Sequence, residues 1–163
     1  MTTMTVAEYR ARCSKKGAAV GKTKGGKRKD IGLYVRSSWE ANMVRIYRYT
    51  NTKFQYEPCE FAFEGIKRGC RFYKPDFYLP DEDVYVELKG YLNGESKTRL
   101  KRMLKYHPTI ATKMRIVVDQ IFSRDFKLTK IASAIISLGY EVTQLQAYAP
   151  LEKTYRFLPE WES

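Results

Sequence analysis

The stretch from Lys74 to Gly90, KPDFYLPDEDVYVELKG, sets the strongest limit on how this chain can fold. Apolar and polar side chains alternate from Val84 to Lys89, which predicts a β-strand. The residues from Phe72 to Leu79 predict the preceding strand, and the residues from Pro80 to Asp83 predict the turn that joins the two. The stretch therefore predicts an antiparallel hairpin around which the rest of the chain is organised.

This hairpin brings charged side chains of both signs to one place. Asp76 follows Pro75 on the first strand, and Glu87 and Lys89 lie on the second. At about 3.3 Å per residue, Glu87 and Lys89 are roughly 6.6 Å apart on one face of the strand. Antiparallel pairing brings Asp76 close to Glu87, and two carboxylates beside a lysine suit a divalent cation bound next to a phosphate. The alternative is a solvated hairpin whose charges only protect an edge strand.

Length and composition indicate one globular domain with a polyanionic partner. The chain has 163 residues, of which 44% are hydrophobic, and a net charge of +12. Such an excess of positive charge favours a nucleic acid. Three cysteines without C-x-x-C spacing and a single histidine argue against zinc and predict reduced thiols in a cytoplasmic protein, in the host cytoplasm if the chain is encoded by a phage. No apolar run approaches the ~20 residues of a membrane helix, so no membrane partner is expected.

The first thirty residues differ from the rest. Residues 1–30 contain nine basic and two acidic residues, which is +7 of the total charge, together with four glycines. This composition predicts a flexible basic N-terminal arm that contacts nucleic acid, with Lys27, Arg28 and Lys29 among the contacts. A solubilising tail without specific contacts is the alternative.

A helix is predicted from Ser37 to Tyr49, and its first turn contains Glu40. An apolar stripe along this segment indicates one buried face. Ser37 and Glu40 have the spacing of a capping box, in which the carboxylate closes the N-terminus of the helix. The other interpretation is that Glu40 is a third metal ligand beside the hairpin. Residue chemistry leaves the two interpretations open.

A second helix, from Ser96 to His107, is rich in cations. Its five basic residues predict a surface that binds phosphates, with a solvated face as the alternative; they are Lys97, Arg99, Lys101, Arg102 and Lys105. The loop from Glu64 to Gly69 leads into the hairpin. Three further cations lie in or just after this loop, Lys67, Arg68 and Arg71, and a solvated turn is the favoured interpretation for them. His107 precedes Pro108, where a structural role at the helix end is favoured over catalysis.

The remaining segments predict the other elements of an α/β fold. These are strands at Phe54–Tyr56, Cys59–Phe63, Met114–Val118 and Tyr140–Leu145, and a helix at Leu128–Leu138 that Gly139 terminates. The C-terminal tail is expected to pack through its aromatic residues. Helices and strands in this order predict an α/β domain with a mixed central sheet.

The order of these motifs resembles that of a nuclease superfamily. Pro75-Asp76 followed by Glu87-x-Lys89 is similar to the PD-(D/E)xK motif, and with Glu40 upstream the chain resembles phage-type endonuclease I, a family of Holliday-junction resolvases. The similarity continues through His107-Pro108 and Pro159-Glu160-Trp161 and covers residues 37–161 in outline. It implies a restriction-endonuclease-like fold for residues 31–163, with a mixed central β-sheet flanked by helices.

The same resemblance implies an activity. It implies a metal-dependent endodeoxyribonuclease that cuts branched DNA, in which Glu40, Asp76 and Glu87 bind one or two Mg²⁺ or Mn²⁺ ions and act with Lys89. It also implies a homodimer that exchanges an N-terminal helix, so that Glu40 completes the partner's site. The chain departs from the family in its longer basic arm and in its Glu64–Arg71 loop, which leaves junction preference and dimer geometry open. The alternatives are a nicking or site-directed endonuclease on duplex DNA and a non-catalytic nucleic-acid-binding module, and an RNA substrate is not distinguished from DNA.

Overall fold

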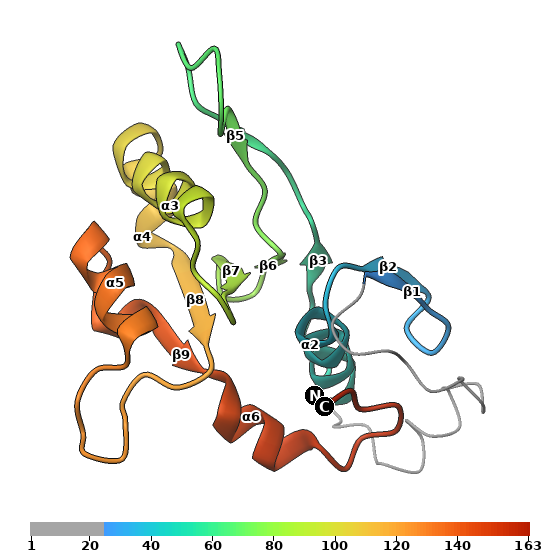
Figure 1. The fold of residues 1–163 in the computed structure, drawn as a ribbon. Coiled ribbons are helices and arrows are strands. Elements are labelled where there is room, and N and C mark those ends of the chain that lie inside the picture. The colour runs from blue at the N-terminus through green and yellow to red at the C-terminus, as the bar shows by residue number, and fades with distance from the viewer. Residues whose placement is uncertain (1–24) are drawn as a thin grey trace. The chain divides into compact units, whose positions relative to one another are not determined.

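The computed structural model describes residues 25–163, which form two compact units (Figure 1). The first unit comprises residues 25–53 together with residues 151–163. The second unit comprises residues 54–150 and contains the predicted hairpin. Among residues 25–163, no helix has the length and apolar character needed to cross a membrane.

The first unit contains a hairpin, a helix and the C-terminal tail. Strand β1 (Gly26–Arg28) pairs antiparallel with β2 (Leu33–Val35), and the helix α2 (Ser38–Tyr49) follows. Gly32 lies in the turn of the hairpin with φ +70°, a conformation that favours glycine. The structure therefore corrects the boundary of the expected flexible arm, because residues 26–30 belong to this hairpin. The rest of that arm, residues 1–24, lies outside the described residues.

Arg45 of α2 is the centre of a buried polar network in the first unit. Arg45 is 1% exposed, and its guanidinium binds Asp30 at 2.7 Å and Glu162 at 3.1 Å. Glu162 also accepts two hydrogen bonds from Arg28, at 2.9 and 2.8 Å. Asn42 fixes the same stretch of tail, because its side-chain amide bonds both the backbone N–H and the carbonyl of Glu162. Charged groups therefore hold the tail in place, in addition to the aromatic contacts that the sequence predicts.

The second unit is built on a mixed sheet of five strands in the order β3-β6-β7-β8-β9. The strands are β3 (Gln55–Tyr56), β6 (Phe77–Leu79), β7 (Val84–Leu88), β8 (Met114–Val118) and β9 (Leu145–Ala147). Strand β6 is antiparallel to both β3 and β7, whereas β8 is parallel to both β7 and β9. The predicted α/β class with a mixed central sheet is confirmed.

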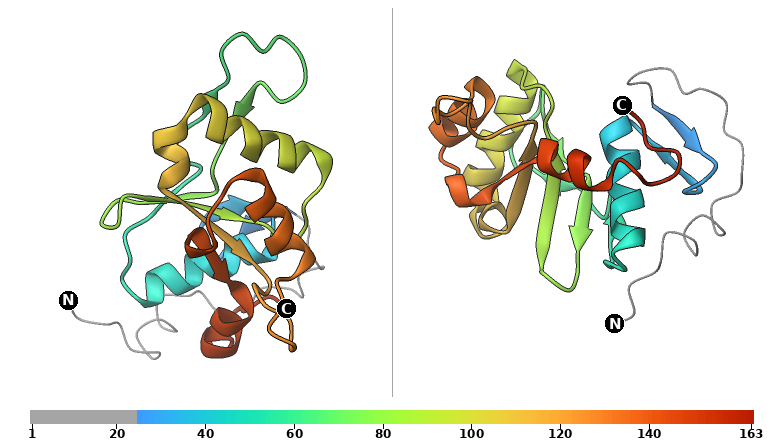
Figure 2. Two further views of the ribbon diagram at one scale, coloured as in Figure 1. Left: turned by 90° about the vertical axis from the view of Figure 1, so that its left-hand side faces the viewer. Right: turned by 90° about the horizontal axis from the view of Figure 1, so that it is seen from below.

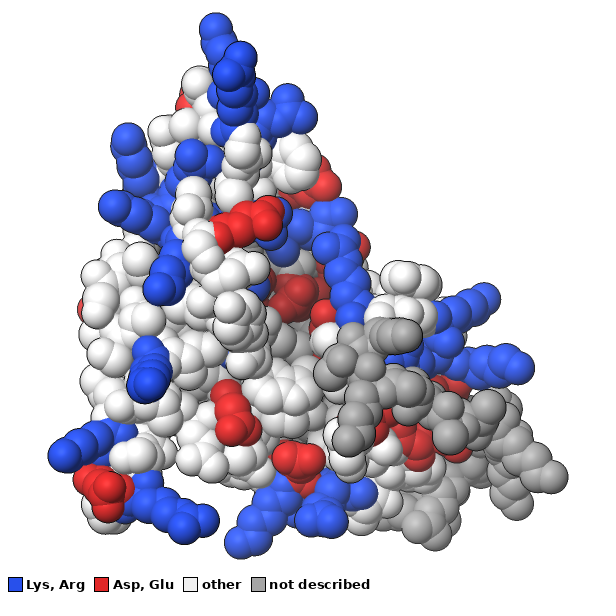
Figure 3. All heavy atoms as spheres, viewed as in Figure 1, with Lys and Arg blue, Asp and Glu red and all other residues white. Residues whose placement is uncertain are grey.

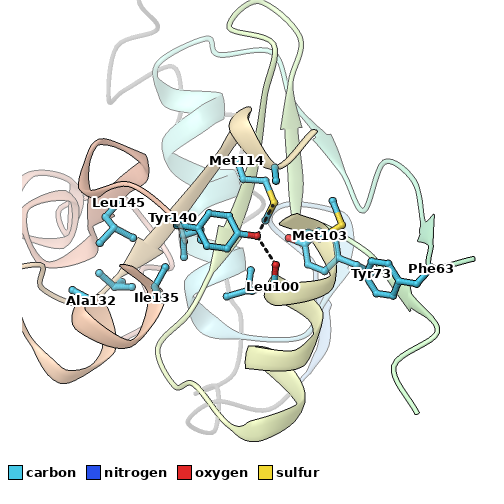
Figure 4. Packing of buried hydrophobic residues seen from close by; sticks show 12 residues of the cluster. Phe63, Tyr73, Leu100, Met103, Met114, Ala132, Ile135, Tyr140 and Leu145 are labelled. Carbon is cyan, nitrogen blue, oxygen red and sulfur yellow. Dashed lines mark hydrogen bonds between the residues drawn. The ribbon is translucent and has the colours of Figure 1, made fainter. Parts of the chain in front are cut away.

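Helices cover one face of this sheet (Figures 1 and 2). The helical elements of the unit are α3 (Gly94–Tyr106), α4 (Pro108–Thr112), α5 (Lys130–Leu138), the 3₁₀ turn η1 (Val142–Gln144) and α6 (Tyr148–Tyr155), which runs on into the first unit. Alternate residues of β8 face α3 and α5; the buried side chains shared by these elements include Leu100, Met103, Met114, Ile116, Val118, Ala132 and Ile135. Tyr140 lies among them, and its hydroxyl donates to the carbonyl of Leu100 at 2.8 Å (Figure 4).

A small two-stranded sheet packs beside α3. Strand β4 (Phe61–Ala62) pairs antiparallel with β5 (Phe72–Tyr73), and we call residues 61–73 the β4–β5 hairpin. Figures 1 and 2 show its loop extending beyond α3 and the central sheet. The loop was predicted from its glycines, and Gly65 and Gly69 both have positive φ, +76° and +74°.

Two predicted strands are corrected. The segment Phe72–Leu79 is not one strand but two, β5 and β6, which belong to different sheets. Pro75 lies between them and lacks the N–H that would continue the ladder. The last strand is Leu145–Ala147 rather than Tyr140–Leu145, because Tyr140 is buried in the core and η1 follows it. Gly139 ends α5 as predicted, with φ +119°.

Tyr140 sets an alkaline limit to the stability of the fold. Burial, and to a smaller extent the charge of Glu87, raises the pKa of Tyr140 above its ordinary value. A pKa raised by folding gives stability that is present below the unfolded-state pKa, about 10, and is lost as the pH rises above it. We expect Tyr140→Phe to be about 1 kcal/mol less stable than wild type near pH 8 because it lacks the bond to Leu100. Between about pH 9 and pH 11 the variant should lose less stability than wild type. Urea unfolding at each pH measures both effects, and parallel pH profiles would contradict the assignment.

Candidate active site

Asp76 and Glu87 face each other across the β6–β7 hairpin. Phe77 pairs with Val86, so Asp76 and Glu87 are opposite one another, one step beyond the last paired residues. One carboxylate oxygen of Asp76 accepts a hydrogen bond from the backbone N–H of Leu88 at 2.7 Å. Opposed residues of an antiparallel pair have Cβ atoms about 4.5–5.5 Å apart and project from the same face. The two carboxylates therefore share one end of the hairpin.

Glu87 is held from two sides. It is 4% exposed, and one of its carboxylate oxygens forms an ion pair with the ammonium group of Lys89. The other oxygen accepts a hydrogen bond from the hydroxyl of Tyr73 at 2.5 Å. Tyr73 lies on β5 and is buried among the core residues that also contact α3. Asp76, Glu87 and Lys89 therefore come together within the second unit, and Tyr73 contacts this group through Glu87.

The charges of this site act on each other. Burial lowers the pKa of Lys89, but the negative charge and hydrogen bond of Glu87 and the charge of Asp76 outweigh it, and the net pKa is raised. Burial, followed by the charge and hydrogen bond of Glu87, raises the pKa of Tyr73 well above its ordinary value. Lys89 is therefore a cation at neutral pH, and Tyr73 is a neutral hydrogen-bond donor to Glu87.

Tyr73 was not predicted as a residue of the site. It lies three residues before Asp76, and its strand belongs to a different sheet from that of Asp76. The only local feature that sets Tyr73 apart is that it comes just before Lys74-Pro75, where the predicted strand Phe72–Leu79 is interrupted. Its position near Glu87 depends on the pairing of β5 with β4, which connects segments about ten residues apart.

Glu40 belongs to the first unit and caps α2. Its backbone N–H donates to the Ser37 hydroxyl at 3.2 Å, and that hydroxyl donates to one carboxylate oxygen of Glu40 at 3.0 Å. The other carboxylate oxygen accepts a hydrogen bond from the N–H of Arg36 at 2.8 Å. Glu40 therefore closes the N-terminus of α2 as the capping interpretation expected, except that its carboxylate bonds the N–H of Arg36 rather than that of Ser37. The role of Glu40 as a metal ligand remains a proposal that depends on the resemblance.

The five expected phosphate contacts on α3 have different surroundings. Lys97, Lys101 and Lys105 are exposed. Arg99 forms an ion pair with Glu95 one turn earlier, and Arg102 donates a hydrogen bond to the carbonyl of Cys70. All five lie on one helix of the unit that contains Asp76 and Glu87.

The expected contacts at the end of the arm are partly corrected. Lys27 and Lys29 are exposed in the β1–β2 hairpin. Arg28, however, is 6% exposed and directs its guanidinium to Glu162, so it does not fit the expected role of a solvent-facing phosphate contact. His107 is the C-cap of α3, the position at which a structural role was favoured, and its ring bonds the carbonyl of Ala62 at 2.7 Å and packs on Phe63.

The two carboxylates of the site, those of Asp76 and Glu87, are ligands that suit a hard divalent cation. Within residues 25–163, no three His, Cys, Asp or Glu side chains gather as a metal-binding group. Mg²⁺ does not need three, because it is commonly held by one or two carboxylates, with waters and substrate phosphate completing its shell. Each carboxylate has about four acceptor positions, so the hydrogen bonds that Asp76 and Glu87 accept leave room for a cation.

Comparison with protein-family models, with characterised proteins and with solved structures gives no match to this chain.

Proposed function

We propose that this protein is a metal-dependent endonuclease with a restriction-endonuclease-like fold, which hydrolyses phosphodiester bonds in branched DNA. The observation that supports the proposal most is the convergence of Asp76, Glu87 and Lys89 at one end of the β6–β7 hairpin. A solvated hairpin would leave these side chains in water, but Glu87 is buried and bonded on both carboxylate oxygens. The preference for branched DNA comes from the resemblance to phage-type endonuclease I.

Each residue then has a definite task. Asp76 and Glu87 would hold one or two Mg²⁺ or Mn²⁺ ions, with Glu40 as a further ligand. When bound, the cation supplies charge neutralisation at the phosphate and a water of lowered pKa. Lys89, as a cation beside Glu87, would donate a hydrogen bond to a phosphate oxygen and stabilise the negative charge that grows on it. Tyr73 would keep the Glu87 carboxylate in one orientation.

A homodimer completes the proposal. A four-way junction has two-fold symmetry and requires two symmetric cuts, whereas one hydrolytic site makes one nick, so a two-fold enzyme suits it. By the resemblance, the chains exchange an N-terminal helix, and Glu40 would then serve the site of the partner chain. In that case Glu40 would cap α2 and bind metal with the remaining acceptor positions of the same carboxylate.

The direct test is cleavage of a labelled four-way junction and of its separate linear arms. We expect cleavage with Mg²⁺ or Mn²⁺, none in EDTA, and paired cuts in the junction at a higher rate than in the arms. Equal rates on junction and arms would favour the alternative of a nicking endonuclease on duplex DNA. Metal-independent binding to both substrates without any cleavage would refute the proposal and favour a non-catalytic module.

A further inference from the structure

Positive charge is concentrated on one part of the second unit. Residues 63–72 of the β4–β5 hairpin and residues 94–106 of α3 contain eight basic and two acidic residues, a net charge of +6. The rest of residues 54–150 contains seven basic and ten acidic residues, a net charge of −3. Figure 3 shows Lys and Arg side chains gathered over the protruding loop and over α3. We call these two segments the basic face.

Acidic residues at the β6–β7 turn have local partners, whereas four cations of the basic face form no ion pair within residues 25–163. At the β6–β7 turn, Asp83 binds Lys113 and Glu82 binds Arg115, both at 2.5 Å. On the basic face, the side chains of Lys67, Arg68, Lys97 and Lys101 are exposed and form no ion pair with any residue from 25 to 163. Their charge is therefore available to an external polyanion.

The β4–β5 hairpin is fastened to α3, so the two segments act as one surface. Phe63 is buried and its ring contacts that of Tyr106 at 5.7 Å. Arg102 donates a hydrogen bond to the carbonyl of Cys70, and the Cys70 thiol lies 3.8 Å from the carbonyl of Glu95. Contacts from Phe63 and Cys70, next to the paired strands, thus hold the hairpin against α3.

The basic face begins at the candidate active site. The helix α3 contacts β5, the strand that contains Tyr73. Tyr73, at the base of the β4–β5 hairpin, donates its hydrogen bond to Glu87. A strand bound at Asp76 and Glu87 would therefore meet α3 next and the hairpin loop beyond it.

The arrangement suits the backbone of a nucleic acid better than a lipid surface. Lys97, Lys101 and Lys105 recur every four residues and span about 12 Å of α3, a length over which one DNA strand presents roughly three to four phosphates. The exposed aromatic residues near them, Phe72 at 47% and Tyr91 at 77%, are single side chains. A membrane-binding segment requires a continuous apolar face opposite its cations.

We infer that the β4–β5 hairpin is a second phosphate-binding element, which holds a duplex arm of the DNA together with α3. The inference depends on the proposed function for its choice of DNA, and it reverses the solvated turn that the sequence favoured for Lys67, Arg68 and Arg71. It also assigns a purpose to the loop in which the chain departs from the endonuclease I pattern.

The test compares two triple variants with equal charge changes. K67Q/R68Q/R71Q removes the cations of the hairpin. R124Q/K127Q/K130Q removes three exposed cations of the same unit, two between β8 and α5 and one at the first residue of α5. Binding of a labelled DNA duplex is followed by fluorescence anisotropy in EDTA, over a range of KCl concentrations. We expect the hairpin variant to bind about tenfold more weakly and to reduce the slope of log K against log[KCl] by about two to three. The control variant should stay within about twofold of wild type.

Several results would overturn the inference. They are an unchanged affinity and salt slope in the hairpin variant, an equal loss in both variants, or a hairpin-dependent binding to phosphatidylserine vesicles in place of DNA. The charge-retaining variant K67R/R68K/R71K, expected to bind like wild type, separates lost charge from a misfolded loop. Hairpin-dependent DNA binding without cleavage would contradict the proposed nuclease while supporting this inference, and cleavage without hairpin-dependent binding would do the reverse.

Discussion

Asp76→Ala and Lys89→Ala are each expected to lower the rate of metal-dependent DNA cleavage by about a thousandfold or more. Asp76 supplies one of the two carboxylates that the second unit offers to a cation, and its loss leaves Glu87 alone. Lys89 supplies the positive charge beside Glu87, and alanine would leave that buried carboxylate with only Tyr73 as partner. Single-turnover cleavage of a labelled junction at saturating protein measures the loss without interference from product release.

A matched pair at the other end of the same sheet provides the control. Asp83 and Lys113 also form a carboxylate–ammonium pair, at 2.5 Å, but they lie at the β6–β7 turn. Asp83→Ala and Lys113→Ala should cleave within about threefold of wild type, since exposed pairs contribute little to stability and these are remote from the site. Full activity in Asp76→Ala or in Lys89→Ala would refute the assignment of the site.

The sequence predicted those elements whose signals are local. Val84–Leu88 and Met114–Val118 are strands because alternation or a β-branched run specifies them, and Ser38–Tyr49 is a helix that begins after a capping serine. The proximity of Asp76 and Glu87 was also predictable, because a short turn fixes the register of a hairpin. Local pattern was thus sufficient for the central part of the candidate site.

The features that were missed depend on which segments pair in the folded chain. Tyr73 lies on β5, which pairs with β4 and belongs to a different sheet from β6, and no periodicity in the sequence indicates that pairing. Arg28 appeared to be one more cation of a basic arm, but Glu162, 134 residues later, makes it a buried structural group. Composition indicates the charge of a segment, whereas the partner that neutralises that charge is decided by tertiary structure.

Glu40 also combines a feature that local sequence predicts with one that it does not. Its capping bonds involve Arg36 and Ser37, which are neighbours in sequence, so the local pattern predicted them. Its proposed second role, as a metal ligand, requires a metal and, by the resemblance, a second chain. No local sequence pattern around Glu40 indicates either of them. Capping and metal binding use the same carboxylate, so a change of Glu40 alters both helix stability and activity and cannot by itself separate the two roles.

Arg45→Met is expected to lower the free energy of unfolding of the first unit by about 3–5 kcal/mol, because it removes one partner from a buried ionic network. Asp30 would lose both of its bonds from the guanidinium of Arg45, at 2.7 and 3.2 Å, while it remains buried. Glu162 would keep Arg28 as its only ionic partner in the network described for Arg45. Urea unfolding followed by circular dichroism gives the change in stability.

Arg48 is a suitable control for this prediction because it lies on the same helix and contacts the same turn from the exposed side. It donates to the carbonyl of Ile31 at 2.6 Å, so Arg48→Met should cost only about 1 kcal/mol. Removing the stranded carboxylate together with the arginine, in Arg45→Met with Asp30→Leu, should recover part of the loss, since replacing both members of a buried pair is often close to neutral. Two results would contradict this explanation: a loss of stability in Arg45→Met no larger than that in Arg48→Met, or a double variant less stable than Arg45→Met alone. Either would show that the loss in Arg45→Met does not come from leaving the Asp30 carboxylate buried without its partner.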